Sequence, residues 1–249
     1  MFELITFELI SFGIIAGFVG GFFGVGGGMV LIPLLLFIGF DMKSAIAISI
    51  MQMVFTSLFG TFLNYKKNKD FLENGILIGL GGFSGGILSG FIVSNISAFN
   101  LQLLFLFIVG FAIYRVGLTK IHESSNKQKH NKYLLLIIGF FIGLIAMSIG
   151  VGGSVMLTPI LVSFMLYSLK DASSMGLFFV VFSSIAGFIS LSYNGHMQYY
   201  EGTIVGIASL IGVYFGIKIK NIINLKSYKR FILILYTIIF LSVLYKLFN

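Results

Sequence analysis

Two glycine-rich stretches of this sequence decide its architecture. Residues 24–33 read GVGGGMVLIP, and residues 150–159 read GVGGSVMLTP. The second follows the first at an offset of 126, and at an offset of 127 further pairs match: Ala45 and Ala172, Phe55 and Phe182, Ser57 and Ser184, Gly60 and Gly187, Gly75 and Gly202, Gly79 and Gly206, and Gly85 and Gly212. We therefore predict two copies of one unit, repeat 1 over residues 1–118 and repeat 2 over residues 133–249, joined by a polar linker over residues 119–132.

The composition is that of an integral membrane protein. Of 249 residues, 58% are hydrophobic and 10% are charged, and the mean hydropathy is +1.06, whereas about a quarter of the residues of soluble domains are charged. An apolar surplus of this size must face lipid, so a soluble globule is excluded. The Lys and Arg residues lie between apolar segments without stacking aromatic residues, which argues against a nucleic-acid partner. Cysteine is absent, so disulfide and thiolate chemistry are excluded.

Ten apolar segments predict the helices of an all-α fold. They are residues 4–22, 29–39, 43–64, 74–95, 101–118, 133–149, 155–168, 171–193, 199–217 and 229–247. The segments 29–39 and 155–168 are too short to cross a bilayer, and each follows one of the glycine-rich stretches. We therefore predict that each repeat begins with a hairpin, made of a helix and a short half-helix with glycine at the apex, and continues with three transmembrane helices.

The basic residues decide whether the two repeats are parallel or inverted, because short cytoplasmic loops are enriched in Lys and Arg. If each hairpin enters and leaves on the same side, the second repeat is inverted. Fourteen Lys and Arg, Lys220 among them, then lie on one face, against Lys43 and Lys246 on the other. If each hairpin is instead one broken span, the repeats are parallel and the split is nine against seven. The charge asymmetry favours the inverted arrangement, with both termini outside and the linker in the cytoplasm.

The two glycine-rich turns are expected to meet near the middle of the membrane, approached from opposite faces. A half-helix begins at each turn, so free N–H groups and a positive dipole end point inward from both sides, which favours an anion. Inverted repeats with broken helices place transporter substrates in this position. Glycine permits close approach and a positive φ, which we expect at both turns, Gly27 and Gly153 included. The alternative is that small residues only pack helices together, and we assign that role to Gly13, Gly17, Gly81, Gly82, Gly85, Gly86 and Gly90.

The predicted substrate-binding set combines the turns with nearby hydroxyl and amide groups. It comprises Gly26, Gly27, Gly28, Gly152, Gly153 and Ser154, together with Gln52, Thr56, Ser57, Ser148, Thr158, Ser183 and Ser184. Ser and Thr in membrane helices most often bond to their own backbone, so residues at matching positions of the two repeats are the stronger candidates. Pro33 and Pro159 each remove a helical hydrogen bond and are predicted to be structural kinks or hinges.

The sequence offers no chemistry for an enzyme. No His, Lys or Arg is expected well inside a span, and no GKS or GKT sequence suggests nucleotide binding. The three histidines, His122, His130 and His196, all lie in predicted loops. No catalytic residue, metal site or cofactor is therefore predicted.

These motifs resemble the TauE/SafE sulfite exporter family. The resemblance rests on the stretch beginning at Gly24 and followed by Pro33, on its copy from Gly150 to Pro159, and on the alanines that open the next helices. It covers nearly the whole chain. It implies a bacterial or archaeal carrier in the inner (cytoplasmic) membrane for sulfite, sulfoacetate or other organosulfonates. Because Ser154 stands where the first copy has Gly28, the two halves of the site need not be equivalent.

The expected function is transport of small sulfur oxyanions. The anion binds between the two turns and moves by alternating access, and the chain works in a lipid bilayer, with or without assembly into a homo-oligomer. The alternatives are a non-transporting membrane sensor or structural partner, and an anion channel. Measured solute flux distinguishes the first of these alternatives from a transporter.

Overall fold

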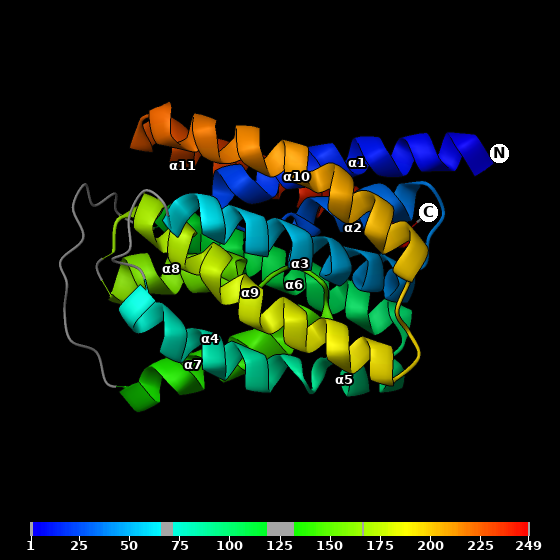
Figure 1. Cartoon of the computed structure of the whole chain (residues 1–249), viewed down its shortest axis with the longest axis horizontal. Helices are drawn as coiled ribbons and strands as arrows, with labels where there is room; N and C mark the ends of the chain where they lie inside the picture. Colours follow the sequence, from blue (N-terminus) through cyan, green and yellow to red (C-terminus); the bar gives the residue numbers. More distant parts are fainter. Residues whose placement is uncertain (1, 66–71, 119–131, 166, 249) are drawn as a thin grey trace.

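The computed structural model describes residues 2–65, 72–118, 132–165 and 167–248, and within these ranges it contains helices and no strands (Figure 1). Six helices precede the linker: α1 (Phe2–Phe23), α2 (Gly28–Phe37), α3 (Met42–Tyr65), α4 (Leu72–Gly86), α5 (Ser89–Asn95) and α6 (Ala98–Leu118). Five follow it: α7 (Lys132–Ser148), α8 (Ser154–Phe164), α9 (Leu169–Tyr193), α10 (Tyr199–Ile222) and α11 (Leu225–Phe248). The predicted all-α fold is confirmed. Nearly all of the predicted linker, and Lys66, Lys67 and Lys69, lie outside the described residues.

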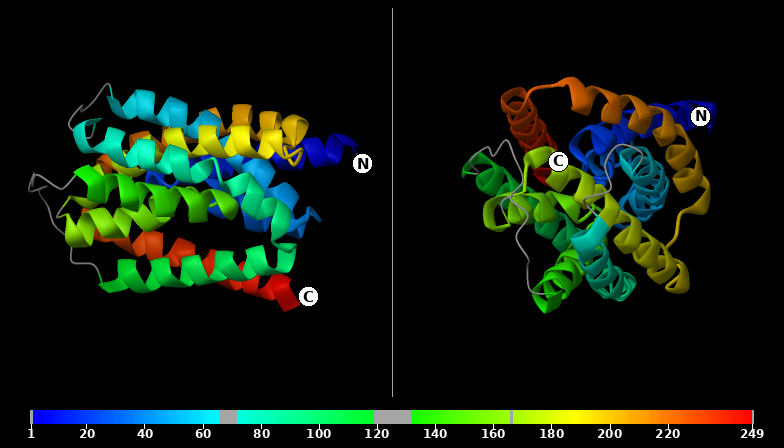
Figure 2. Two further views of the ribbon diagram at one scale, coloured as in Figure 1. Left: turned by 90° about the horizontal axis from the view of Figure 1, so that it is seen from below. Right: turned by 60° about the vertical axis from the view of Figure 1, so that its left-hand side comes forward.

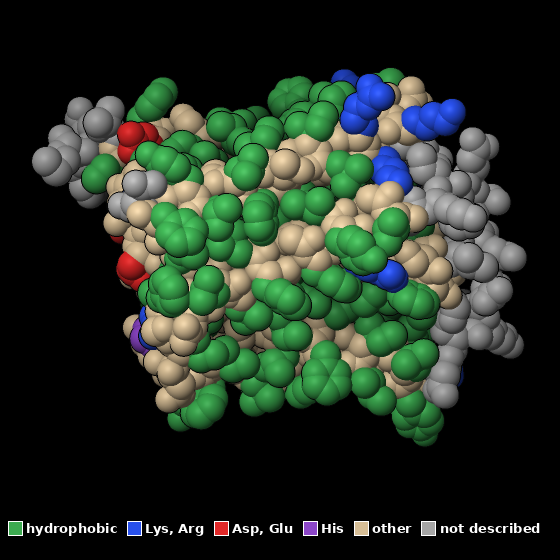
Figure 3. Space-filling view, turned by 180° about the vertical axis from the view of Figure 1, so that it is seen from behind, with side chains coloured by type: hydrophobic (Ala, Val, Ile, Leu, Met, Phe, Trp, Pro, Cys, Tyr) green, Lys and Arg blue, Asp and Glu red, His purple; other side chains and the backbone are tan. Residues whose placement is uncertain are grey.

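Seven segments of the described chain are long and apolar enough to cross a membrane. They are Ile5–Phe23, Met42–Tyr65, Gly75–Asn95, Ala98–Leu118, Leu169–Tyr193, Tyr199–Ile222 and Lys226–Phe248. As predicted, the half-helices α2 and α8 are too short, with 10 and 11 residues. Figure 3 shows a broad band of hydrophobic side chains with most of the visible charged side chains toward its two ends. The chain is a multi-pass integral membrane protein.

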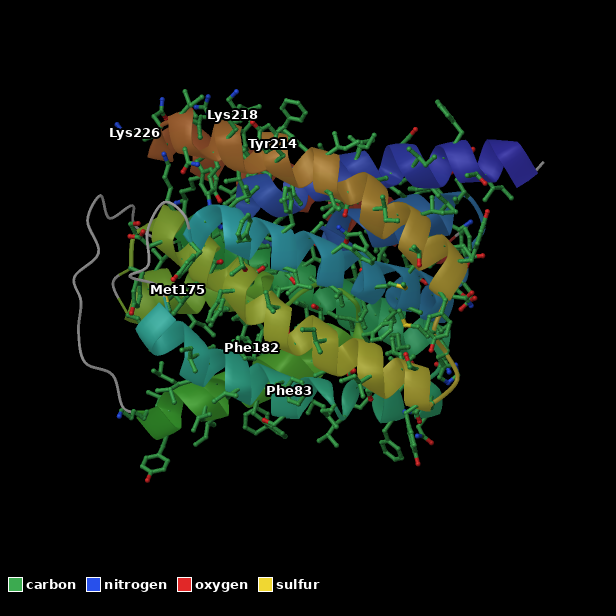
Figure 4. All side chains as sticks on the ribbon, in the orientation of Figure 1. Phe83, Met175, Phe182, Tyr214, Lys218 and Lys226 are labelled. Carbon is green, nitrogen blue, oxygen red and sulfur yellow. The ribbon has the colours of Figure 1, made fainter. Side chains whose placement is uncertain are left out.

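The helices run roughly along one axis, so the bundle has two ends (Figures 1 and 2). The N-terminus of α1 and the C-terminus of α11 lie at one end, called here the terminal end. The C-terminus of α6 and the N-terminus of α7 lie at the other, the linker end, where Figure 4 also places Lys218 and Lys226. The hairpin of α1 and α2 enters from the terminal end, and that of α7 and α8 enters from the linker end.

Glycines at four-residue spacing let the long hairpin helices pack closely against their neighbours. A Cβ at Gly13 of α1 would lie 2.6 Å from the main-chain oxygen of Val205 in α10, and one at Gly17 would overlap that of Ser209. Gly139 of α7 lies equally close to the backbone of α4. Small residues permit such backbone approach in membrane helices, so the packing role predicted for Gly13 and Gly17 is confirmed.

The predicted span over residues 74–95 is broken into α4 and α5. At the break, Ser190 of α9 donates a short hydrogen bond from its Oγ to the main-chain oxygen of Ile87 and accepts one from the N–H of Gly90 at 2.9 Å. A side chain that inserts into the hydrogen-bond ladder in this way breaks or bends a helix. The sequence pattern did not predict the break because its cause lies on another helix.

The starts of α3 and α9 are capped by the same pair of residue types in exchanged order. At α3, Asp41 accepts hydrogen bonds from the Ser44 N–H (3.2 Å) and from Ser44 Oγ (2.6 Å). At α9, Ser168 accepts from the Asp171 N–H (3.1 Å) and donates to Asp171 Oδ2 (2.7 Å). Partial burial raises the pKa of the Asp41 carboxyl, but the hydrogen bonds from Ser44 and from the Lys43 N–H outweigh this effect and lower the pKa below its usual value.

Candidate functional site

Two loops occupy the interior of the bundle. Loop 1 (residues 24–27) joins α1 to α2, and loop 2 (residues 149–153) joins α7 to α8, and every residue of both is buried. The angle φ is positive at Gly24, Gly26 and Gly27 in loop 1 and at Gly150 and Gly152 in loop 2. Residues with a Cβ rarely adopt this conformation. The backbone conformation itself therefore requires glycine at these positions.

The two loops touch each other. A Cβ at Gly28, the first residue of α2, would overlap the main-chain oxygen of Gly150. A Cβ at Gly152 would lie 2.6 Å from the main-chain oxygen of Val25. Only glycine permits so close an approach of two backbones. The meeting of the two glycine-rich turns, expected from the sequence, is present in the structure.

Both half-helices begin at this contact. Gly27 is the N-cap of α2, Gly153 is the N-cap of α8, and neither makes a side-chain cap hydrogen bond within the described chain. Main-chain oxygens of the loops accept from the N–H groups of Val30, Leu31, Val155, Met156 and Leu157. Only the N–H groups ahead of these, of Gly28, Met29 and Ser154, are left for other acceptors. Two positive helix ends that meet in a buried region favour a negatively charged ligand.

Gly153 has a different role from the one expected. Its φ is −62°, an ordinary helical value, so the expectation of a positive φ at this position is wrong. Gly152, with φ at 73°, carries that conformation instead. A Cβ at Gly153 would overlap the ring of Phe179 and would lie 2.7 Å from Ile142 Cγ2. Lack of room, rather than backbone conformation, therefore requires glycine at Gly153.

One face of α3 lies against both loops. Thr56 Oγ1 donates a hydrogen bond to the main-chain oxygen of Gly26 (2.9 Å), and Ser49 Oγ donates one to that of Gly150 (2.6 Å). Gln52 lies between these residues on the helix, and its Nε2 is 3.4 Å from Thr56 Oγ1. All three polar side chains are fully buried. A helix from the first half of the chain thus holds the loops of both halves.

Ser49 was not among the site residues predicted from the sequence. Its matching position in the second half holds Gly176 rather than a hydroxyl residue, so the comparison of matching positions gave no signal. The spacing of Ser49, Gln52 and Thr56 would have identified it, because residues three, four and seven apart lie on one face of a helix. In the structure, a Cβ at Gly176 would lie 2.6 Å from Ser154 Cβ, so α9 approaches the start of α8 closely at this point.

The two sides of the site are not equivalent. Gln52 of α3 borders loop 1, since its Nε2 would lie 2.8 Å from a Cβ at Gly27. The residue of α9 that matches Gln52 is Phe179, whose ring borders Gly153. Thr56 bonds to loop 1, whereas the hydroxyl of its match, Ser183, donates to its own helix at 3.2 Å. The α3 side is therefore polar, and the α9 side is largely apolar.

Three predicted site residues carry buried polar atoms that have no hydrogen-bond partner in the described chain. These atoms are Ser154 Oγ, Thr158 Oγ1 and Gln52 Oε1. Ser154 and Thr158 lie one turn apart at the start of α8, where the hydroxyls can donate to an anion. Rotation of the Gln52 amide by 180° would present its NH₂ group in place of Oε1. Buried polar groups are nearly always paired, so each of these atoms requires a partner.

The other predicted hydroxyls bond to their own helices. Ser148, Ser57 and Ser184 are buried, and each donates to a main-chain oxygen three or four residues earlier, at 2.7, 3.4 and 3.5 Å respectively. Pro33 and Pro159 lie inside the half-helices, each five residues after the helix start, and both are buried. The structure thus brings the two loops, Gln52, Thr56 and Ser154 together, with Thr158 one turn beyond Ser154 on α8. The remaining serines bond to their own helices.

The polar groups around the loops are hydroxyls, amides and main-chain groups. Among the described residues, no three His, Asp or Glu side chains lie close enough to hold a metal ion. The arrangement offers directional hydrogen bonds and helix dipoles rather than formal charge.

One basic residue is buried at the end of a span. No Lys or Arg was expected well inside a span, and Lys220 lies in the last turn of the span Tyr199–Ile222, but it is only 1% exposed. Its Nζ donates to Ser174 Oγ (3.2 Å) and to Asn64 Oδ1 (3.5 Å). These partners come from α9 and α3, so neighbouring helices, and not the sequence of α10, bury this residue near the end of its helix.

The chain is similar to known membrane transporter proteins. The family model described as Sulfite exporter TauE/SafE matches residues 9–243. The chain is similar to the probable membrane transporter protein YunE of Bacillus subtilis, with 23% identity covering 94% of each chain. It is also similar to a probable membrane transporter protein of Methanocaldococcus jannaschii, with 30% identity covering 90% of each chain. No solved structure gives a significant match.

Proposed function

The chain belongs to the TauE/SafE family of membrane transporters, and on this premise we propose that it carries small sulfur-containing oxyanions, such as sulfite, sulfoacetate or other organosulfonates. The anion binds between loop 1 and loop 2. The substrate-binding residues are those predicted from the sequence, with Gln52, Thr56 and Ser154 beside the loops, Thr158 one turn farther along α8, and Ser49 as an addition to the set.

One observation carries this proposal. Ser154 Oγ and Thr158 Oγ1 are buried beside the positive end of α8 and have no partner in the described chain. Leaving a buried hydroxyl unpaired costs about 1–3 kcal/mol. An oxyanion that accepts hydrogen bonds from both hydroxyls would remove that cost and would meet the favourable field of two helix ends.

Alternating access is the mechanism that these features support. Both loops are buried, so an anion reaches them only if part of the protein moves. The two hairpins enter from opposite ends (Figure 1), which is the arrangement of inverted repeats that expose one site to each side in turn. Pro33 and Pro159 interrupt the ladders of the half-helices and are suited to act as hinges. Export of an anion from a cell gains about 2.3 kcal/mol per charge per 100 mV, so membrane potential alone can drive it.

We place the linker end in the cytoplasm and both termini outside the inner membrane. The described basic residues support this orientation through their distribution, because short cytoplasmic loops are rich in Lys and Arg. At the linker end they are Arg115, Lys132, Lys170, Lys218, Lys220, Lys226, Lys229 and Arg230, and at the terminal end they are Lys43 and Lys246.

The proposal is tested by flux of radiolabelled sulfite, sulfate, thiosulfate and sulfoacetate in proteoliposomes. Saturable, protein-dependent flux of at least one of these anions is expected. Absence of flux for the whole panel would favour a sensor or structural partner. Flux that does not saturate would favour an anion channel.

A further inference from the structure

Lys220 forms a buried polar cluster with residues of two neighbouring helices. Its ammonium group donates to Ser174 Oγ of α9 and Asn64 Oδ1 of α3, and Lys220 and Asn64 are 1% and 6% exposed. A lysine in a membrane span is costly and marks a functional site by default. A lysine near a helix end usually extends its amine to the membrane surface, but this side chain is buried instead.

The hydrogen bonds of this cluster leave a donor without an acceptor. The ammonium group can only donate, so it fixes the orientation of the Asn64 amide, with Oδ1 toward Lys220 and Nδ2 away. Asn64 Nδ2 is buried and has no partner in the described chain. A buried NH₂ group beside a positive charge requires an acceptor, and an oxyanion has several acceptor atoms, so one oxyanion can accept from Asn64 Nδ2 and from an ammonium group.

The cluster is present on only one side of the molecule. At an offset of 127, Lys220, Ser174 and Asn64 correspond to Val93, Ala47 and Leu191. These three counterparts are all buried and apolar. Because apolar side chains fill the matching positions, the packing of three helices around Lys220 does not by itself require a charged group.

The cluster lies on the linker side of loop 1. Ser173, which precedes Ser174 on α9, is in contact with Gly24, because a Cβ at Gly24 would overlap the Ser173 main-chain oxygen. Ser174 is the next residue of α9 and lies at about the level of Gly24. Asn64 lies about two turns farther toward the linker end than Thr56, the residue of α3 that bonds to Gly26. The buried side chains of Leu177, Val213 and Ile217 form an apolar group on the same helices, α9 and α10. Lys220, in the last turn of α10, lies on the linker side of this apolar group.

We propose that Lys220, Ser174 and Asn64 form a second anion subsite, which captures the oxyanion from the linker end before it reaches the loops. This inference rests on the proposed function for its substrate class. The apolar counterparts on the opposite side give the carrier no such subsite toward the terminal end. The carrier is thus asymmetric, with tighter capture of anions from the linker end.

The variants for the test are Lys220→Met, Asn64→Asp and Lys218→Met. Lys220→Met removes the charge and keeps most of the volume. Asn64→Asp is nearly isosteric and places a carboxylate beside Lys220, which would strengthen a purely structural contact but repel an anion. Lys218 is exposed on α10 (Figure 4), so Lys218→Met is a control with the same change of charge near the same helix end.

Two readouts are compared for each variant. The first is thermal stabilisation of the purified protein by sulfite. The second is the half-saturation concentration for sulfite uptake into inverted and right-side-out membrane vesicles. Lys220→Met and Asn64→Asp should each weaken the sulfite stabilisation and raise half-saturation from the linker end about tenfold, with a much smaller change from the terminal end. Lys218→Met should behave as the wild type.

Each outcome decides a separate point. If Asn64→Asp keeps wild-type sulfite stabilisation and sidedness, the subsite is overturned and Lys220 is a structural residue. Equal effects of Lys220→Met from both ends would also overturn it. If the wild type shows no flux but sulfite stabilises it in a Lys220-dependent manner, the subsite stands and the proposed transport function fails.

Discussion

Ser49 Oγ donates a 2.6 Å hydrogen bond to the main-chain oxygen of Gly150, although the two residues are 101 positions apart and lie in opposite halves of the chain. Both residues are buried where loop 1 and loop 2 meet. This bond ties α3 to loop 2. Any motion that separates loop 2 from α3 must break it, so the bond couples the two halves at the candidate site.

Ser49→Ala should therefore destabilise the protein and alter transport together. The unpaired Gly150 oxygen is expected to cost about 1 kcal/mol of unfolding free energy, which corresponds to a melting temperature lower by about 2–4 °C for a chain of this size. Thermal unfolding in detergent measures the shift, and sulfite flux measures the coupling. Ser242→Ala is the matched control, because Ser242 Oγ donates only to its own helix. Equal stability of both variants would contradict the proposed tether.

Ser154→Ala and Thr158→Val should weaken anion binding without loss of stability. Their hydroxyls have no partner in the described chain, so their removal relieves an unpaired buried group in the free protein. A direct ligand to an anion should instead lose about 1–3 kcal/mol of binding. Sulfite titration and thermal unfolding of the same samples separate the two effects. A drop in stability with unchanged affinity would mean that these hydroxyls are structural.

Gly27→Val and Gly153→Val should both abolish flux while the protein remains extractable and monodisperse. The reasons differ, because Gly27 has a φ of 94° whereas Gly153 only lacks room beside Phe179. Trimming Phe179 to Leu should consequently restore part of the flux of Gly153→Ala. No trimming of a neighbour should rescue Gly27→Ala. Gly117→Ala, where nothing lies within 4 Å of an added Cβ, is the control.

Chloride should compete poorly with sulfite for transport. The groups around the loops are hydroxyls, amides and main-chain N–H groups, whose hydrogen bonds are directional and individually modest. A site of this kind distinguishes anions by shape and number of acceptor atoms more than by net charge. Inhibition of labelled sulfite flux by equal concentrations of chloride, sulfate and methanesulfonate measures the preference. Chloride inhibition as strong as that by methanesulfonate would favour a water-filled anion pathway.

The proposed orientation is open to a direct chemical test, because the natural chain contains no Cys. A single cysteine at Lys67 or Lys127 should react with a membrane-impermeant thiol reagent only after permeabilisation. One at Gln198, between α9 and α10 at the terminal end, should react in intact cells. Labelling of all three positions from outside would exclude the inverted arrangement.

The repeated glycine-rich stretches were sufficient to predict the membrane-spanning helical fold, the two half-helices and the contact between the turns. These features depend on properties that are local in sequence. Apolar segment length sets which helices can span a bilayer. Runs of adjacent glycines mark backbone that must adopt a positive φ or approach another backbone closely, as Gly26 and Gly152 do.

Other features depend on which side chains meet across helices, and only the tertiary structure decided them. Ser190 breaks the span between α4 and α5 from another helix, and Phe179, rather than a backbone angle, restricts Gly153. The sequence places Lys220, like Lys218, after the end of a predicted helix, but residues of α3 and α9 bury its side chain. Burial and hydrogen bonding of these side chains depend on the whole packed bundle, because their partners come from segments tens to hundreds of residues away in the sequence. The repeated stretches in the sequence therefore determined the helical framework and its glycine-rich turns, and packing between the helices determined which polar groups are buried around them.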